Sequence, residues 1–309
     1  MSAKEGKNLS QREKELWWEI NQRQGVERAR SLLELSKIVY EQARYSESLA
    51  MCESARDIYL AAGGENFLDE ITDSNYGILN CYLAKGNYIE AAETAGVLTE
   101  LFIETGHPML DEMYRDQGRY WYSAGEYEKS IASHLKGMAI VNIDDGPRVR
   151  AIDLLNLGMA HNQLKEYQVA IAELMEAIEI FRAEKDPYGV SRCHGELTEI
   201  YFELGDGEQL QRWAKKALDY AELAGDRRWQ YMMHFYLGAA LRMVGDIDGA
   251  YAQVVKAKEL ALFWGETDFH AIVKIEKELA GLEKARGDAK AAEEILRRVG
   301  TIEETLLAS

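Results

Sequence analysis

The sequence is poor in several residues and patterns that mark common protein classes. Three of its 309 residues are prolines and three are cysteines, and no run of 18 apolar residues occurs. Cys52, Cys81 and Cys193 are odd in number and widely spaced, which argues against a disulfide framework and predicts buried, reduced thiols. The first residues are polar where a secretory signal is apolar. We therefore expect a cytoplasmic protein without a transmembrane helix.

Basic residues are outnumbered by acidic ones. The chain has 36 Lys and Arg against 53 Asp and Glu, which gives a formal net charge of −17 at pH 7. Direct binding to nucleic acid or to an anionic membrane needs clustered Lys and Arg that neutralise phosphates. We expect neither as a partner, whereas a basic protein would be attracted in a salt-dependent way.

Helix-forming residues are abundant. Apolar residues make up 47% of the chain, and Ala, Leu, Glu and Lys are frequent while long β-branched runs are missing. This composition predicts an all-α fold. The length exceeds the size at which one compact core usually stops growing, so we also expect repetition or division.

A short turn phrase recurs along the chain with a period near 40 residues. Its third residue falls at 45, 88, 127, 167, 207, 247 and 289. The clearest copies combine a small or flexible residue, a polar residue and a tyrosine: Gly86-Asn87-Tyr88, Gly125-Glu126-Tyr127 and Lys165-Glu166-Tyr167. Such regular spacing predicts a tandem repeat in which each turn joins two helices.

Other positions keep the same phase. Seven residues before the turn, Gly118, Gly158 and Gly238 would allow close helix approach. Small or apolar residues follow the turn in six copies: Ala91, Ser130, Ala170, Leu210, Ala250 and Ala292. This spacing predicts one buried stripe per helix and antiparallel helix pairs. The three prolines, Pro108, Pro147 and Pro187, lie between pairs and are expected in the first turn of the following helix.

These residues resemble the tetratricopeptide repeat (TPR), whose pattern is matched by Leu157-Gly158, His161, Tyr167, Ala170 and Ala177. The resemblance covers residues 26–300 and implies a right-handed α-α superhelical solenoid of about seven helix pairs. The longer period is similar to an extended subclass found in cell-polarity adaptors, bacterial pheromone receptors and regulator sensor domains. Residues 1–25 are then an N-terminal capping helix, and residues 301–309 are a C-terminal cap.

Both ends carry helix-start signals. Ser10 with Glu13 forms a capping box, and Leu16, Trp17 and Ile20 offer an apolar side to the first repeat. The alternative is that Trp17 and Trp18 form an exposed docking motif. At the other end, Thr301 with Glu304 predicts a short terminal helix.

The TPR resemblance implies a groove lined by the first helix of each pair. Transferring that phase gives the candidate partner-binding residues Tyr76, Asn80, Arg115, Arg119, Tyr122, Asn156, Met159, Asn162, Gln163, Arg192, Glu196, Glu199, Phe202, Phe235, Tyr236 and Arg242. Their polar groups would orient an extended or helical peptide, and their apolar groups would form pockets. The alternative for any single residue is that it is solvated or covers the edge of the core.

The sequence offers little that would support catalysis. No two of its six histidines are at helical spacing, and His161 occupies a packing position of the repeat. Cys193 and His194 are adjacent, so their side chains would point about 100° apart on a helix, which opposes a catalytic pair. Gly205-Asp206-Gly207 lacks the strand and spacing of a phosphate loop. We expect no enzyme, no metal and no cofactor.

Three functions remain open at this point. The leading hypothesis is a non-enzymatic adaptor or inhibitor that binds a protein or peptide segment in its groove. The second is a ligand-responsive regulatory receptor that senses a peptide or small metabolite and controls a partner protein. The third is a structural subunit that forms a homo-oligomer.

Overall fold

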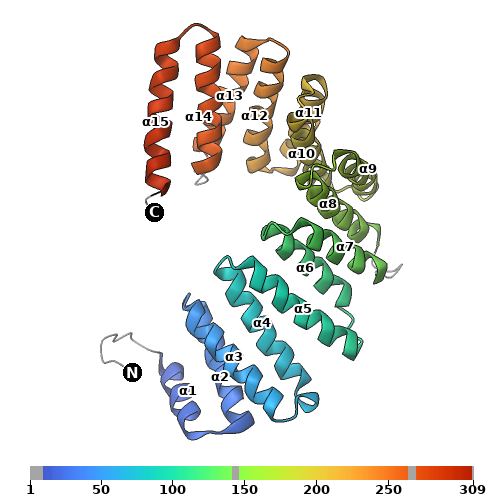
Figure 1. Cartoon of the computed structure of the whole chain (residues 1–309), viewed down its shortest axis with the longest axis vertical. Coiled ribbons are helices and arrows are strands. Elements are labelled where there is room, and N and C mark those ends of the chain that lie inside the picture. Colours follow the sequence, from blue (N-terminus) through green and yellow to red (C-terminus); the bar gives the residue numbers. More distant parts are fainter. Residues whose placement is uncertain (1–9, 141–145, 264–268, 308–309) are drawn as a thin grey trace. The chain divides into compact units, whose positions relative to one another are not determined.

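The computed structural model describes residues 10–140, 146–263 and 269–307, and all regular structure within them is helical. Figure 1 shows the helices as successive hairpins along the chain. After α1 (Gln11–Gln22) the pairs are α2 (Gly25–Glu41) with α3 (Tyr45–Ala61), α4 (Leu68–Ala84) with α5 (Tyr88–Thr105), α6 (Leu110–Ser123) with α7 (Tyr127–Ile140), α8 (Pro147–Gln163) with α9 (Tyr167–Ala183), α10 (Pro187–Glu203) with α11 (Gly207–Ala224), α12 (Arg227–Met243) with α13 (Ile247–Phe263), and α14 (Phe269–Ala285) with α15 (Ala289–Leu307). A short 3-10 helix, η1 (Gly64–Asn66), precedes α4. The fold is therefore an all-α helical repeat, as predicted.

The predicted turns close each pair through a left-handed residue. The turn residue has a positive φ in all seven pairs: Ala43 (59°), Gly86 (73°), Gly125 (80°), Lys165 (62°), Gly205 (70°), Gly245 (88°) and Gly287 (94°). Glycine adopts this conformation without a steric penalty, whereas Ala43 and Lys165 must hold a Cβ there. The turn phase read from the sequence thus fixes the start of every second helix.

Three glycines hold paired helices close together. A Cβ at Gly118 would lie 2.6 Å from His134 Nε2, one at Gly158 would lie 2.8 Å from Leu174 Cγ, and one at Gly238 would lie 2.3 Å from Val254 Cγ2. These distances are shorter than any van der Waals contact, so a side chain would push the second helix away. The close approach predicted from the repeat phase is confirmed.

Two expectations about helix boundaries need correction. Pro147 and Pro187 begin α8 and α10, but Pro108 lies in the turn ahead of α6, which begins at Leu110. Thr301 does not start a separate helix, because α15 continues through it and its hydroxyl donates to the Arg297 carbonyl at 3.3 Å. The hydroxyl satisfied a bond within the helix instead of capping a new one.

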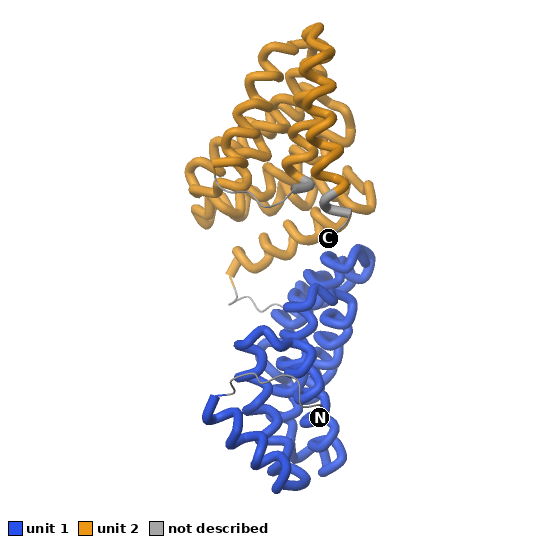
Figure 2. Tube along the Cα trace, turned by 90° about the vertical axis from the view of Figure 1, so that its left-hand side faces the viewer, with its two compact units in different colours: residues 1–142 blue, residues 143–309 orange. Residues whose placement is uncertain are grey.

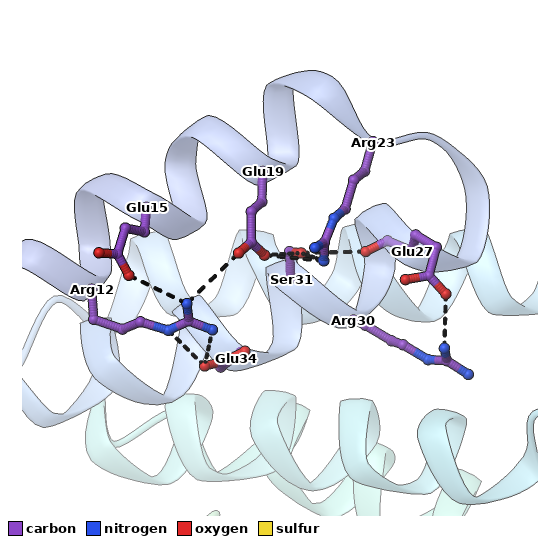
Figure 3. Close-up of polar contacts among 8 residues, drawn as sticks. All are labelled: Arg12, Glu15, Glu19, Arg23, Glu27, Arg30, Ser31 and Glu34. Atoms are coloured by element: carbon purple, nitrogen blue, oxygen red, sulfur yellow. Dashed lines mark hydrogen bonds and ion pairs between the residues drawn. The ribbon is translucent and has the colours of Figure 1, made fainter.

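The first helix covers the end of the first pair. Ser10 and Glu13 form the predicted capping box, and Leu16 and Ile20 are buried against α2. Figure 3 shows polar contacts between the α1 segment and α2, among them the ion pair of Arg12 with Glu34, whose Nη2 and Oε1 lie 2.6 Å apart. Trp17 packs partly against the same core, whereas 65% of Trp18 is exposed. The cap and the exposed tryptophan therefore coexist on one helix.

The helices fall into two compact units, Met1–Asn142 and Ile143–Ser309, which Figure 2 colours separately. In the first unit, Leu35, Leu98 and Phe102 are among the fully buried side chains. In the second unit, Leu174, Leu197 and Val254 are equally buried. Among the helices that the structure describes, none combines the length and the apolar character needed to cross a bilayer.

Candidate partner-binding site

In the second unit, four first helices lie side by side. The first helices α8, α10, α12 and α14 contact one another in that order, and each also pairs with its own second helix. Repeat phase places Asn156 of α8, Arg192 and Glu196 of α10 and Tyr236 of α12 on one side of this layer, and they define what we call the α8–α14 face, in which Glu196 and Tyr236 are themselves buried.

Two carboxylates lie on α10 in this face, and one has no partner. Glu196 is 5% exposed and makes no hydrogen bond or ion pair within the described residues. Burial and the charge of Glu199 raise the pKa of Glu196 to about 8, although Arg192 opposes the shift. Burial also raises the pKa of Glu199, whose Oε1 accepts a 3.1 Å hydrogen bond from the Tyr236 hydroxyl. A hydrogen-bond donor or a cation that reaches such a buried, unpartnered carboxyl stabilises it.

Two buried donors on α8 and α10 also lack a partner in the described part of the chain. Arg192 Nε and Asn156 Nδ2 are both buried and lack a hydrogen-bond acceptor among the described residues. The guanidinium of Arg192 is held by Tyr188 Oη at 3.4 Å, by Met159 Sδ at 3.8 Å and by the Trp229 ring, whose centroid is 5.9 Å from Cζ. Leaving each of these donors unpaired costs roughly 1–3 kcal/mol. The face therefore presents unsatisfied donors and an unsatisfied acceptor together.

Aromatic rings fill the side of the face formed by α10 and α12. The centroids of Phe202 and Tyr236 lie 5.4 Å apart, and those of Phe235 and Tyr236 also lie 5.4 Å apart. Lys274 of α14 places Nζ 5.6 Å from the Phe202 centroid, 5.2 Å from Phe235 and 5.4 Å from Tyr236. A cavity of about 90 Å³ adjoins this cluster and is lined by Arg228, Tyr231, Met232, Phe235, Tyr236, Ala271, Lys274 and Ile275.

The first unit has a wider pocket between α2 and α4, with α3 at its base. Its volume is about 440 Å³, and it is lined by Leu33, Ser36, Lys37, Tyr40, Glu41, Ser48, Cys52, Asp73, Tyr76, Gly77 and Asn80. Two predicted groove residues, Tyr76 and Asn80, thus lie in one pocket. Burial raises the pKa of Tyr76 and of the Cys52 thiol, so neither ionises readily at neutral pH.

Other predicted residues are engaged within the protein. Arg115 donates to Asp111 at 2.7 Å, Arg119 pairs with Asp116, and the Tyr122 ring lies against Tyr127 with centroids 5.4 Å apart. Arg242 Nε lies 2.6 Å from Glu278 Oε1. Asn162 is buried whereas its neighbour Gln163 is exposed, so these two residues do not present equal surface to a partner.

The sequence interpretation missed Lys274 and the α2 side of the first pocket. Lys274 lies 13 residues before Gly287, the same offset that separates Arg192 from Gly205. Tyr40 lies three residues before Ala43, as Phe202 lies three residues before Gly205. Extending the repeat phase to the first and last pairs would have found both residues.

The cysteine and histidines weighed above as catalytic groups make packing and hydrogen-bond contacts with other residues instead. Cys193 and His194 are both fully buried; burial raises the pKa of the thiol and lowers that of the imidazole to about 4. The His194 ring packs against Trp213 and Tyr220 instead. His161 is half-buried, and its Nδ1 lies 2.7 Å from Glu173 Oε2. Among the described residues, no group of three potential metal ligands converges.

Several solved structures have the same fold as this chain. A Signal Transduction ATPase with Numerous Domains protein with a tetratricopeptide repeat sensor, from Pyrococcus horikoshii, superposes with a TM-score of 0.64 at 16% identity, over 98% of this chain and 54% of that one. A tetratricopeptide repeat protein from Parabacteroides merdae gives 0.58 at 13% identity, over 89% and 93%. This chain has the tetratricopeptide-repeat fold. A TPR-like match also exists to a Rap protein complexed with Competence and Sporulation Factor, with a TM-score of 0.55 at 12% identity over 96% and 80%.

Sequence comparison gives shorter matches. No family model matches this chain. Among curated proteins, it is 25% identical over 153 residues to outer dynein arm-docking complex subunit 4 of Mus musculus, covering 50% of this chain and 24% of the relative. It is 32% identical over 95 residues to response regulator aspartate phosphatase I of Bacillus subtilis (strain 168), covering 31% of this chain and 22% of the relative. The matches thus span less than a quarter of these relatives.

Proposed function

We propose that this TPR protein is a non-enzymatic adaptor or inhibitor that binds an extended protein or peptide segment on the α8–α14 face. The observation that carries the proposal is the set of buried, unpaired groups on α8 and α10: Asn156 Nδ2, Arg192 Nε and the Glu196 carboxyl. Structures normally pair such groups. An extended peptide offers both carbonyl acceptors and N–H donors, so it would satisfy both kinds.

Affinity capture from the native source tests this proposal. The bait would be the wild-type chain, the Asn156→Ala/Arg192→Gln variant and a matched variant of the first pocket, Tyr76→Phe/Asn80→Ala. We expect the α8–α14 variant to lose a defined set of proteins that the other two baits retain. Tyr236→Ala is unsuitable because Tyr236 is 4% exposed and packs in the core, so its loss would destabilise the fold. Equal recovery on all three baits rules the proposal out.

A regulatory receptor is the second candidate. The Rap protein in complex with Competence and Sporulation Factor and the signal-transduction ATPase with a TPR sensor favour it, because both have this fold. In that case a ligand would shift the chain between two conformations and so change its affinity for a second protein. Hydrogen exchange with and without a captured ligand would decide: protection spread beyond the binding face supports a receptor, and protection confined to the face supports an adaptor.

An oligomeric scaffold is the third candidate, and the 65% exposure of Trp18 on α1 favours it. An exposed tryptophan beside polar residues is a frequent centre of protein interfaces. Sedimentation of the wild type and of Trp18→Ala at two concentrations tests it. A concentration-dependent mass that Trp18→Ala abolishes would support the scaffold, and a constant monomer mass would eliminate it.

A further inference from the structure

The ring cluster of α10 and α12 has the geometry of a cation site. Phe202, Phe235 and Tyr236 each lie within 5.6 Å of one point, which is the position of Lys274 Nζ. Ring faces attract an ammonium or guanidinium group within about 6 Å of the centroid. A single ring beside a lysine is common on protein surfaces, but three rings around one nitrogen form a cage.

The cage adjoins two carboxyls, Glu196 and Glu199, that form no ion pair among the described residues. Tyr236, a wall of the cage, donates to Glu199, and Glu199 in turn interacts with the charge of Glu196. Neither Lys274 nor Arg192 forms an ion pair with either carboxyl in the described part of the chain. The site therefore holds an unpaired carboxyl, Glu196, that is 5% exposed. Such a group gains most from a cation that brings its own hydrogen-bond donors.

We propose that this cage is a binding site for a lysine or arginine side chain of the bound segment, and that Lys274 occupies it when no partner is present. The proposal rests on the proposed function, because the basic side chain belongs to the segment bound on the α8–α14 face. The formal net charge of −17 also favours a partner with basic side chains, because it attracts positive charge. The cavity beside the cage holds about 90 Å³, room for the end of one side chain and a few waters.

Lys274 can leave the cage at low cost. Its side chain is exposed, and within the described residues it makes ring contacts but no hydrogen bond or ion pair. Ring contacts of an exposed lysine are worth about 0.5–1 kcal/mol. A ligand cation that also reached Glu199 and Glu196 would exceed this, so Lys274 acts as a weak internal competitor and lowers the apparent affinity for the ligand.

Selection from a randomised heptapeptide display library tests the proposal without a known partner. Four full-length proteins would be used: wild type, Glu199→Gln, Lys274→Met and Lys290→Met. Glu199→Gln keeps an acceptor for the Tyr236 hydroxyl but removes the charge, and Lys274→Met keeps an apolar chain but removes the ammonium. Lys290 on α15 is exposed and serves as a charge-matched control. Thermal melts of all four proteins confirm that each is folded.

We expect wild type to select peptides with Lys or Arg at one fixed position. Glu199→Gln should lose that preference, and Lys274→Met should bind the selected peptides roughly two- to fivefold more tightly, which corresponds to about 0.5–1 kcal/mol. Lys290→Met should match wild type. Selection of peptides without a basic position leaves the proposed function intact but overturns the cage.

Three further outcomes also contradict the proposal. Enrichment of acidic residues would assign Lys274 and the neighbouring Arg228 to an anion site. Failure of every protein to select any peptide would remove the proposed function and this inference together. Equal affinities of Lys274→Met and wild type for a basic peptide would show that Lys274 does not compete for the site.

Discussion

The two units use the same helix pairs but differ in the chemistry of their first helices. In the first unit, the α2–α4 pocket is wide, and polar side chains such as Lys37, Asp73 and Asn80 line it while remaining exposed. In the second unit, Glu196 is buried and unpaired, and three rings surround Lys274. Solvent reaches the first set freely, whereas Glu196 in the second set is 5% exposed and gains more from a partner. The comparison indicates that the second unit carries the specific binding chemistry.

The largest effect should come from replacing the buried carboxyl of Glu196 in the second unit. The pKa of Glu196 is raised to about 8 in the folded chain. Between the ordinary glutamate pKa and this value, Glu196 is protonated in the folded state but ionised in the unfolded state. Stability should therefore fall as pH rises from about 4.5 to about 8. Glu196→Gln should abolish this loss and be more stable than wild type at pH 9 by roughly 5 kcal/mol, as measured by urea denaturation at several pH values.

Glu203→Gln is the control for that measurement, because Glu203 is exposed on the same helix. It should follow the wild-type pH profile. If Glu196→Gln and wild type lose stability in parallel between pH 5 and pH 9, Glu196 is neutralised by a group other than a proton, and the contrast between the units disappears.

A second titration should also affect the second unit, in the acid range. Burial lowers the pKa of His194 to about 4 in the folded chain. Between about pH 6.5 and pH 4, His194 is therefore protonated in the unfolded state but neutral in the folded state. Stability should then decline as pH falls from about 6.5 towards 4. His194→Leu should reduce the decline between pH 7 and pH 5 by about 2 kcal/mol. Calorimetric melts at both pH values measure this, and an unchanged decline in the variant would refute it.

Stability should be lowered by an added methyl group at Gly238 on α12 but not at Gly281 on α14. Gly238→Ala would place a Cβ 2.3 Å from Val254 Cγ2 and should destabilise the chain by about 1–2 kcal/mol. Gly281→Ala meets nothing within 4 Å on α14 and should stabilise by about 0.5–1 kcal/mol. Opposite signs in urea denaturation support the packing account. Equal effects of the two substitutions would show that backbone entropy alone decides both.

The smallest changes in stability are expected from substitutions at the left-handed turn residues of the two units. Lys165 in the second unit and Ala43 in the first hold left-handed φ values of 62° and 59°. Lys165→Gly and Ala43→Gly should each relieve strain and stabilise by about 0.5–1 kcal/mol. Gly205→Ala, with φ at 70°, should cost a similar amount. A loss of stability in Lys165→Gly would mean that the side chain, not the backbone, matters at that turn.

Repeat phase made the framework predictable. A glycine seven residues before a turn predicts close helix approach whatever its neighbours, and Gly118, Gly158 and Gly238 all show it. The seven turn positions were also readable, because a left-handed residue favours glycine. Pro108 and Thr301 were misread because proline and a hydroxyl each have several allowed positions near a helix end.

The chemistry of the face was less predictable. Phase placed Glu196, Glu199 and Tyr236 on one face, but it could not show that Glu196 lacks a partner or that Tyr236 bonds Glu199. Those facts depend on rotamers and on neighbouring helices. Lys274 lies 72 residues after Phe202 along the chain, so no local pattern links it to the Phe202 ring.

Photo-crosslinking tests the central claim, that a partner segment lies on the α8–α14 face, most directly. A photoreactive phenylalanine analogue would replace Met159 on this face, Asn80 in the α2–α4 pocket, or exposed Leu223 on α11, and each protein would be irradiated in an extract of the native source. The account predicts a discrete cross-linked protein at position 159 that positions 80 and 223 do not give. Specific cross-links at 80 or 223, with none at 159, would contradict it.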